Sequence, residues 1–246
     1  LYKYEIMLEK LQKIFKHGGR KTSPFGGEVG LGLGGFSTDW HCHILPGVDD
    51  GLPTMADALE VLAAYEKVGI TRVWLTPHIM EDIPNTTAGL HERFAELQAA
   101  YSGQVSLHLA AENMLDNLFE ERLAARDLLT IGEHGDHLLV ETSYFNPPMD
   151  LHGTLDRIKA AGYYPLLAHP ERYVYMDEKD YKDLIARGVK FQLNLPSLGG
   201  FYGSTAQKKS RWLLKQGFYT VAGSDLHRPH TLDRLSPLPA TIPNEL

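Results

Sequence analysis

Histidines and carboxylates follow most of the short apolar segments of this sequence. The first of them, His41 and His43, are two residues apart, so on an extended strand both imidazoles would point to one side and could bind one cation. Alone this pair is weak evidence, because buried histidines bonded to neighbouring carbonyls are commoner than metal ligands. Residues of the same types recur after later segments, and the full set is His41, His43, His78, Glu112, Glu141, His169, Asp225 and His227.

These side chains predict a polynuclear metal site. Imidazoles and carboxylates without thiolates are typical ligands of manganese, iron, zinc or mixed centres. Because the set exceeds what one ion needs, two or three ions are expected. Clustered cations lower the pKa of a bound water toward neutrality, which favours hydrolysis by metal-activated hydroxide.

The elements that must position these residues alternate between apolar runs and amphipathic stretches. The pattern predicts crossover helices between parallel strands, and a closed or nearly closed α/β barrel in preference to an open sheet. In such a barrel the carboxyl ends of the strands form one active face. Strands are expected at 37–42, 71–76, 104–111, 137–142, 164–168, 189–194 and 218–222, and helices at 54–68, 87–102, 115–126, 150–162, 178–187 and 204–216.

Composition excludes several classes of protein. The 246 residues are 43% hydrophobic and 22% charged, as in a globular chain, and the net charge of -7 with scattered basic residues argues against nucleic-acid binding or a polybasic membrane patch. No apolar run is long enough to span a membrane or to form a signal peptide, which predicts a cytoplasmic protein. Residues 1–16 form an amphipathic helical pattern and are followed by a Gly-rich linker up to residue 35, so the catalytic domain is expected at 36–246. This extension would either pack on the domain or serve docking or oligomerisation.

The single cysteine is not expected to be a nucleophile. A cysteine-dependent tyrosine phosphatase needs an arginine six residues after its cysteine to bind phosphate, and the residue six positions after Cys42 is Val48. Free cysteines are usually small buried residues. Cys42 is therefore predicted to be a buried strand residue.

Five motifs together resemble a known superfamily. They are His41-Cys42-His43, Gly47-Val48-Asp49-Asp50-Gly51, Thr76-Pro77-His78, His169-Pro170-Glu171-Arg172 and Gly223-Ser224-Asp225-Leu226-His227. From about Asp39 to His230 the chain resembles the PHP (polymerase and histidinol phosphatase) superfamily. Within it, the chain looks most like the metal-dependent tyrosine-protein phosphatases of bacterial capsule and exopolysaccharide gene clusters.

This resemblance implies a distorted (β/α)7 barrel, similar to a TIM barrel, with three divalent ions that are usually manganese. The implied substrate is a phosphotyrosine protein, such as a bacterial tyrosine kinase of polysaccharide export, and oligomers are common among such enzymes. One implied ion site comprises His41, His43, Glu112 and Asp225, the second shares Glu112 and adds Glu141 and His169, and the third comprises Asp50, His78 and His227.

Phosphate recognition requires a cation besides the metals. Arg172 is the best candidate for a bidentate clamp, and the alternative is a surface arginine paired with a nearby carboxylate such as Glu171. Many relatives have a second phosphate-binding arginine in a longer loop after His227, whereas this loop is short. Arg228 or His230 could replace that arginine, or the metals and Arg172 could hold the phosphate. His230 could also protonate the leaving group. Aromatic residues after Glu141 and after Arg172, namely Tyr144, Phe145, Tyr173 and Tyr175, either stack on a phosphotyrosine ring or seal the barrel rim.

Two rival functions share these residues. The first is a small-molecule phosphatase, for instance for histidinol phosphate, which would use the same metals. The second is a metal-binding scaffold without catalytic activity, which measurable turnover would exclude. Nuclease activity is disfavoured by the acidic chain.

Overall fold

The computed structural model describes residues 35–235 and 242–246, and the predicted amino-terminal helix and most of its linker lie outside these residues. The strands are β1 (Thr38–Cys42), β2 (Arg72–Leu75), β3 (His78–Ile79), β4 (Ser106–Leu109), β5 (Glu112–Met114), β6 (His137–Glu141), β7 (Tyr164–Ala168), β8 (Lys190–Asn194) and β9 (Tyr219–Gly223). The α-helices are α2 (Met55–Val68), α3 (Thr87–Ala100), α4 (Asn117–Ala125), α5 (Leu151–Ala160), α6 (Glu178–Ala186), α7 (Leu195–Leu198) and α8 (Gly203–Gln216). Two 3-10 helices, η1 (Pro170–Arg172) and η2 (Pro229–Arg234), follow β7 and β9.

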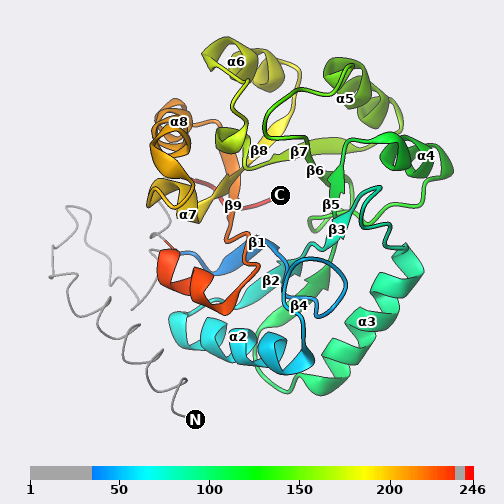
Figure 1. Cartoon of the computed structure of the whole chain (residues 1–246), viewed down its shortest axis with the longest axis vertical. Helices are drawn as coiled ribbons and strands as arrows, with labels where there is room; N and C mark the ends of the chain where they lie inside the picture. Colours follow the sequence, from blue (N-terminus) through cyan, green and yellow to red (C-terminus); the bar gives the residue numbers. More distant parts are fainter. Residues whose placement is uncertain (1–34, 236–241) are drawn as a thin grey trace, which may run out of the picture.

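All the strand pairs within the two sheets are parallel, as the alternating pattern predicts. One sheet has the order β1-β2-β4 and the other has the order β3-β5-β6-β7-β8-β9. Hydrogen bonds also link the end of β1 to the segment after β9, because Asp225 N donates to His41 O and His43 N donates to Leu226 O. Figure 1 shows the strands at the centre with helices such as α2, α3, α5 and α8 around them. The described residues therefore form a mixed α/β fold with parallel sheets.

Two of the predicted strands are wrong in their extent. The strand expected at 71–76 ends at Leu75, and a second strand starts at His78 after Pro77, which has no N–H for a ladder. The strand expected at 104–111 is likewise replaced by β4 and β5. His78 and Glu112 are register partners in the short β3–β5 ladder, which continues the register of the β2–β4 ladder. The other five strands are confirmed to within a residue or two, while α7 lies between the strand expected at 189–194 and the helix expected at 204–216.

Capping residues mark the ends of many of the helices. Five begin at a side-chain cap that accepts a backbone N–H: Thr54, Thr86, Asp116, Asp150 and Asp177. The helices α2 and α8 end at glycines in the left-handed region, Gly69 and Gly217, as their positions predict. These signals fix where each helix starts and stops, and so where the strand ends lie.

Both faces of the sheets are buried. The larger apolar cluster includes helix residues such as Leu62 and Leu213 together with strand residues such as Val140. A separate cluster is formed by other strand residues, which are Trp40, Trp74, Leu139, Leu166 and Val221 with a few neighbours. Strands buried on both faces explain the continuous apolar runs in the sequence. Among the described residues, no helix is long and apolar enough to cross a membrane.

Candidate metal centre

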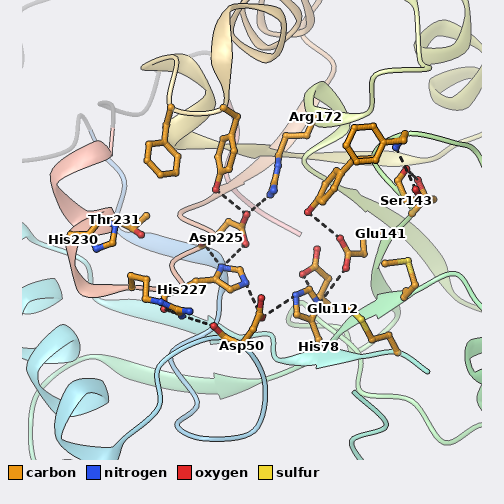
Figure 2. A pocket seen from close by; sticks show the side chains of 18 residues that line it. Asp50, His78, Glu112, Glu141, Ser143, Arg172, Asp225, His227, His230 and Thr231 are labelled. Carbon is orange, nitrogen blue, oxygen red and sulfur yellow. Dashed lines mark hydrogen bonds and ion pairs between the residues drawn. The ribbon is translucent and has the colours of Figure 1, made fainter. Parts of the chain in front are cut away.

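The predicted ligands lie together at the carboxyl ends of the strands. Side-chain donor atoms come within 4.8 Å of one another in three overlapping groups, and His169 adjoins them through Glu112. Six of these side chains line one pocket, and Figure 2 shows them pointing toward one another. The groups are His41, His43, Glu112 and Asp225, then His78, Glu112 and Glu141, then His43, Asp50, His78 and His227.

The first group corresponds to the first implied ion site and is fully buried. The carboxylate Oε2 of Glu112 is 3.0 Å from His41 Nε2 and 3.2 Å from His43 Nε2. Asp225 Oδ1 is 3.6 and 3.5 Å from the same two nitrogens. Two imidazoles and two carboxylates thus face one point, which is a suitable donor set for a divalent ion.

The second group differs in part from the implied site. His169 Nε2 is 2.9 Å from Glu112 Oε1 but 3.8 Å from Glu141 Oε2. His78 Nδ1, in contrast, is equally close to the two carboxylates, at 3.3 Å from Glu112 Oε2 and 3.3 Å from Glu141 Oε1. His78 therefore lies between the second and third groups, a position that the motif assignment did not foresee.

The third group is the most accessible. Asp50 is an exposed residue of the loop after β1, and its Oδ1 is 3.6 Å from His78 Nε2 and 3.3 Å from His227 Nε2. The rings of His43 and His227 stack with their centroids 3.9 Å apart. An ion held here would face the solvent side of the pocket.

Left-handed backbone directs two of the side chains. His169 and Asp225, each directly after a strand or one residue beyond it, have φ values of 34° and 49°. For residues other than glycine this region carries strain, and such strain concentrates at functional sites. The turn lets each strand end abruptly with its ligand side chain aimed into the cluster.

The unpaired atoms in this cluster fit bound cations. Glu112 Oε2 and His78 Nδ1 are buried and accept or donate no hydrogen bond within the described residues. A buried polar atom without a partner is costly, whereas a coordinated cation would satisfy both. The donor chemistry and these atoms together support metal binding.

The carboxyl groups of the cluster influence one another. Burial raises the pKa of Glu141 well above its ordinary value, and the negative charges of Glu112 and Asp225 raise it further. Burial would also raise the pKa of Glu112, but its interactions with His41 and His169 outweigh burial and hold that pKa well below the usual range. Three carboxylates this close repel one another unless positive charge lies among them.

Two of the imidazoles are kept neutral. Burial, aided by the charge of His43, lowers the pKa of His78 to about 4. Burial and the charge of Arg172 lower the pKa of His169 to about 4. Neutral imidazole is the form that coordinates a metal.

Three residues behind the ligands were missed from the sequence. Asp49 Oδ2 is 2.8 Å from His43 Nδ1 and also accepts from the backbone N–H of His78. Gln192 Oε1 lies 3.0 Å from His41 Nδ1. Asp39, fully buried, accepts from Tyr65 and from the backbone of Ser224, and so joins the ends of β1 and β9. Polar residues inside buried apolar strands, at positions 39 and 192, were the available signal.

Asp49→Asn should weaken metal binding by about 10- to 100-fold, which is the usual loss of affinity when a residue that orients a metal ligand by a hydrogen bond is replaced. The substitution replaces one carboxylate oxygen by an amide NH2 group, which cannot accept a hydrogen bond. Either His43 Nδ1 or a backbone N–H therefore loses its acceptor. Metal content after dialysis against graded chelator would measure the effect, with the exposed Asp82→Asn as control. Equal metal retention by both variants would contradict the orienting role.

Arg172 lies beside the cluster, not on the open surface. Its Nη1 donates to Asp225 Oδ2 at 2.6 Å, and its side chain is 15% exposed. The alternative pairing with Glu171 is wrong, because the Glu171 carboxylate is buried and accepts from Asn194 N and Tyr219 OH. Burial raises the pKa of Glu171 to about 7.

A pocket of about 710 Å³ opens over the cluster and is lined by Arg172, Arg228 and His230. Arg228 is exposed, and its Nη1 donates to the carbonyls of Asp50, Gly51 and His227 at 2.5, 2.9 and 2.7 Å. His230 is also exposed. All three therefore reach the space above the ligands, while their roles in phosphate binding or proton transfer stay predictions.

The aromatic residues after the ligands divide into two groups. Tyr144 and Phe145 line the pocket, and Phe145 is 72% exposed. Tyr173 is fully buried, with its hydroxyl donating to Ala168 O, and Tyr175 stacks against it. Tyr173 thus packs in the core, and Tyr144 and Phe145 are the two that can contact a substrate.

The prediction for Cys42 is confirmed as to its position: the residue is completely buried in β1. Its thiol donates to Trp74 O at 3.4 Å, and burial raises the pKa of the thiol well above its usual value. Such a group is not a thiolate nucleophile.

Cys42→Ser should keep kcat/KM within about threefold, because the serine hydroxyl can donate to the same carbonyl at the cost of about 1 kcal/mol in stability. Phosphatase assays and metal analysis would check this. Loss of turnover at normal metal content would reopen a role for the thiol.

Comparison with known proteins agrees with this arrangement. Parallel strands whose ends carry imidazoles and carboxylates define an α/β protein with a candidate polynuclear metal centre. A family model described as capsular polysaccharide synthesis, CpsB/CapC, matches residues 37–237, and the chain belongs to this family.

Individual relatives are tyrosine-protein phosphatases by name. YwqE of Bacillus subtilis is 29% identical over 199 residues, which cover 78% of each chain. CpsB of Streptococcus pneumoniae is 27% identical over 202 residues, covering 77% of this chain and 82% of the relative. A crystal structure from a study of these two proteins, described as unique metal-dependent tyrosine phosphatases, superposes with a TM-score of 0.72 at 27% identity and covers 79% of this chain and 81% of the other.

Proposed function

We propose that this protein is a metal-dependent protein-tyrosine phosphatase that hydrolyses phosphotyrosine and acts in capsule or exopolysaccharide synthesis. The observation that carries the proposal is the gathering of nine metal-ligand side chains, six of which line one open pocket together with Arg172. The family membership and the names of its relatives support the substrate.

We assign the metal-binding role to the nine predicted ligands and propose three divalent ions, with manganese as the expected metal and iron or zinc as alternatives. Glu112 would be shared by two ions, and His78 by its position could serve either neighbouring group. When bound, such ions lower the pKa of water and neutralise phosphoryl oxygens.

The other residues act on the phosphate and on the leaving group. Arg172 is held close to Asp225 and would bind a phosphoryl oxygen with the guanidinium nitrogens that Asp225 does not occupy. Arg228 and His230 stand on the open side of the pocket, where His230 would donate a proton to the departing phenolate. Cys42 has no part in the reaction.

The remaining expectations belong to the same proposal. The strands would close into a distorted (β/α)7 barrel, since the end of β1 already bonds to the segment after β9. The expected substrate protein is a tyrosine kinase of polysaccharide export. A cytoplasmic location and an oligomeric state stay predictions from the sequence.

The experiment that tests the proposed function compares two substrates. Protein stripped with chelator and resupplied with Mn²⁺ is assayed on a phosphotyrosine peptide and on histidinol phosphate. We expect metal-restored turnover of the peptide. Restored turnover of histidinol phosphate alone would keep the metal centre and overturn the substrate, and no turnover of either substrate would overturn the enzymatic function.

A further inference from the structure

The guanidinium of Arg172 is enclosed between two tyrosine rings. Its Cζ lies 4.4 Å from the centroid of Tyr144 and 4.1 Å from that of Tyr202. Both distances are within the range of cation–π attraction, which is stronger where the cation is shielded from water. Because the side chain of Arg172 is 15% exposed, both contacts operate in a largely desolvated position.

The three residues come from separate loops at the carboxyl ends of neighbouring strands. Tyr144 follows β6, Arg172 lies in η1 after β7, and Tyr202 precedes α8, in the connection that follows β8. All three line the same pocket. The arrangement therefore depends on the fold and not on local sequence.

Each tyrosine also reaches the ligand cluster. The hydroxyl of Tyr144 is 3.5 Å from Glu141 Oε2, and that of Tyr202 is 3.4 Å from Asp225 Oδ2, the same oxygen that accepts from Arg172. These long hydrogen bonds orient the rings and contribute little by themselves. A flexible arginine is thus held on two faces by rings and at one nitrogen by a carboxylate.

This enclosure has a consequence for phosphate binding. A free arginine loses rotamer freedom when it binds an anion, and a guanidinium already fixed in place loses less. Within the described residues, the hydrogen bond from Arg172 uses Nη1 and leaves the remaining N–H groups for a ligand.

We propose that Tyr144 and Tyr202 are positioning residues that sandwich Arg172 and so fix its guanidinium for binding a phosphoryl group. The proposal rests on the proposed function for the identity of the substrate, but it concerns any phosphoryl group that binds beside the metal ligands. It differs from direct stacking of these rings on a substrate, because here the rings act through Arg172.

The test is a double-mutant cycle with ring-retaining controls. Tyr144→Leu and Tyr202→Leu should each lower kcat/KM for a phosphotyrosine peptide by about 5- to 30-fold, mainly by raising KM. Tyr144→Phe and Tyr202→Phe, which keep the ring, should stay within about threefold. In an Arg172→Ala background the leucine substitutions should cost less than about twofold.

Direct stacking on substrate gives a different result. If the leucine substitutions cost as much with Arg172→Ala as with the wild-type arginine, the rings act on the substrate and the positioning role is overturned. Phenylalanine variants as impaired as the leucine variants would also overturn it, because the hydroxyls and not the rings would then matter. Tyr164→Leu, on the exposed amino-terminal end of β7, is the control for loss of a tyrosine ring elsewhere.

A binding measurement separates this proposal from the proposed function. The affinity of Mn²⁺-loaded protein for inorganic phosphate, measured by calorimetry, should fall in the leucine variants by a factor similar to that in kcat/KM. This readout needs no turnover, so a protein inactive on phosphotyrosine would refute the function while the positioning role is still tested. Unchanged phosphate affinity in folded leucine variants with normal metal content would overturn the positioning role.

Discussion

Glu112→Gln should abolish turnover, with kcat falling by about 1,000-fold or more, while the protein stays folded. Glu112 is the carboxylate common to two of the three ligand groups. Its Oε2 lies 3.0 to 3.3 Å from nitrogens of His41, His43 and His78, and its Oε1 lies 2.9 Å from His169 Nε2. Glutamine removes the negative charge and replaces one of these oxygens by an amide NH2 group, whose hydrogens repel a cation.

The measurement combines kinetics with metal analysis. The Gln variant should bind fewer ions per chain than wild type, and its circular dichroism spectrum should be unchanged. Glu92→Gln, an exposed glutamate on α3, is the matched control and should leave both quantities at wild-type values. Near-normal activity of Glu112→Gln would remove the shared-ligand assignment.

Arg172→Ala should lower kcat/KM by about 10- to 1,000-fold, the scale of one lost charge-assisted contact to a phosphoryl group. Two costs combine in this loss. The phosphate loses a fixed guanidinium, and Asp225 Oδ2 loses its 2.6 Å partner, which leaves a buried carboxylate less well compensated.

Arg172→Lys separates the two costs. Lysine keeps the charge near Asp225 but lacks the planar fork and the stacking surface between the tyrosines, so it should recover only part of the activity. Steady-state kinetics on a phosphotyrosine peptide would measure this, with the exposed Arg211→Ala as control. A loss smaller than threefold for Arg172→Ala would contradict the phosphate-binding role.

The sequence by itself determined the parallel α/β class and which residues could bind metal. Strand and helix boundaries are set locally by apolar runs, by side-chain caps such as Thr54 and Asp116, and by glycines such as Gly69. All of these signals can be identified in the amino-acid sequence. Since parallel strands end on one side, ligand-type residues after successive strands had to converge. The approximate positions of most strands could be predicted for the same reason.

Only the tertiary structure decided how these side chains group. His78 and Glu112 meet because β3 and β5 continue the register of β2 and β4, and a run of apolar residues does not reveal which residues of two strands face each other. Asp49 and Gln192 gain their importance from hydrogen bonds to ligand residues of other segments, Asp49 to His43 and His78 and Gln192 to His41 and His169. The partner of Arg172 is likewise Asp225, more than fifty residues away, and not the adjacent Glu171. Such contacts depend on distances of a few ångströms between loops that follow different strands, and the spacing of residues along the sequence does not encode those distances.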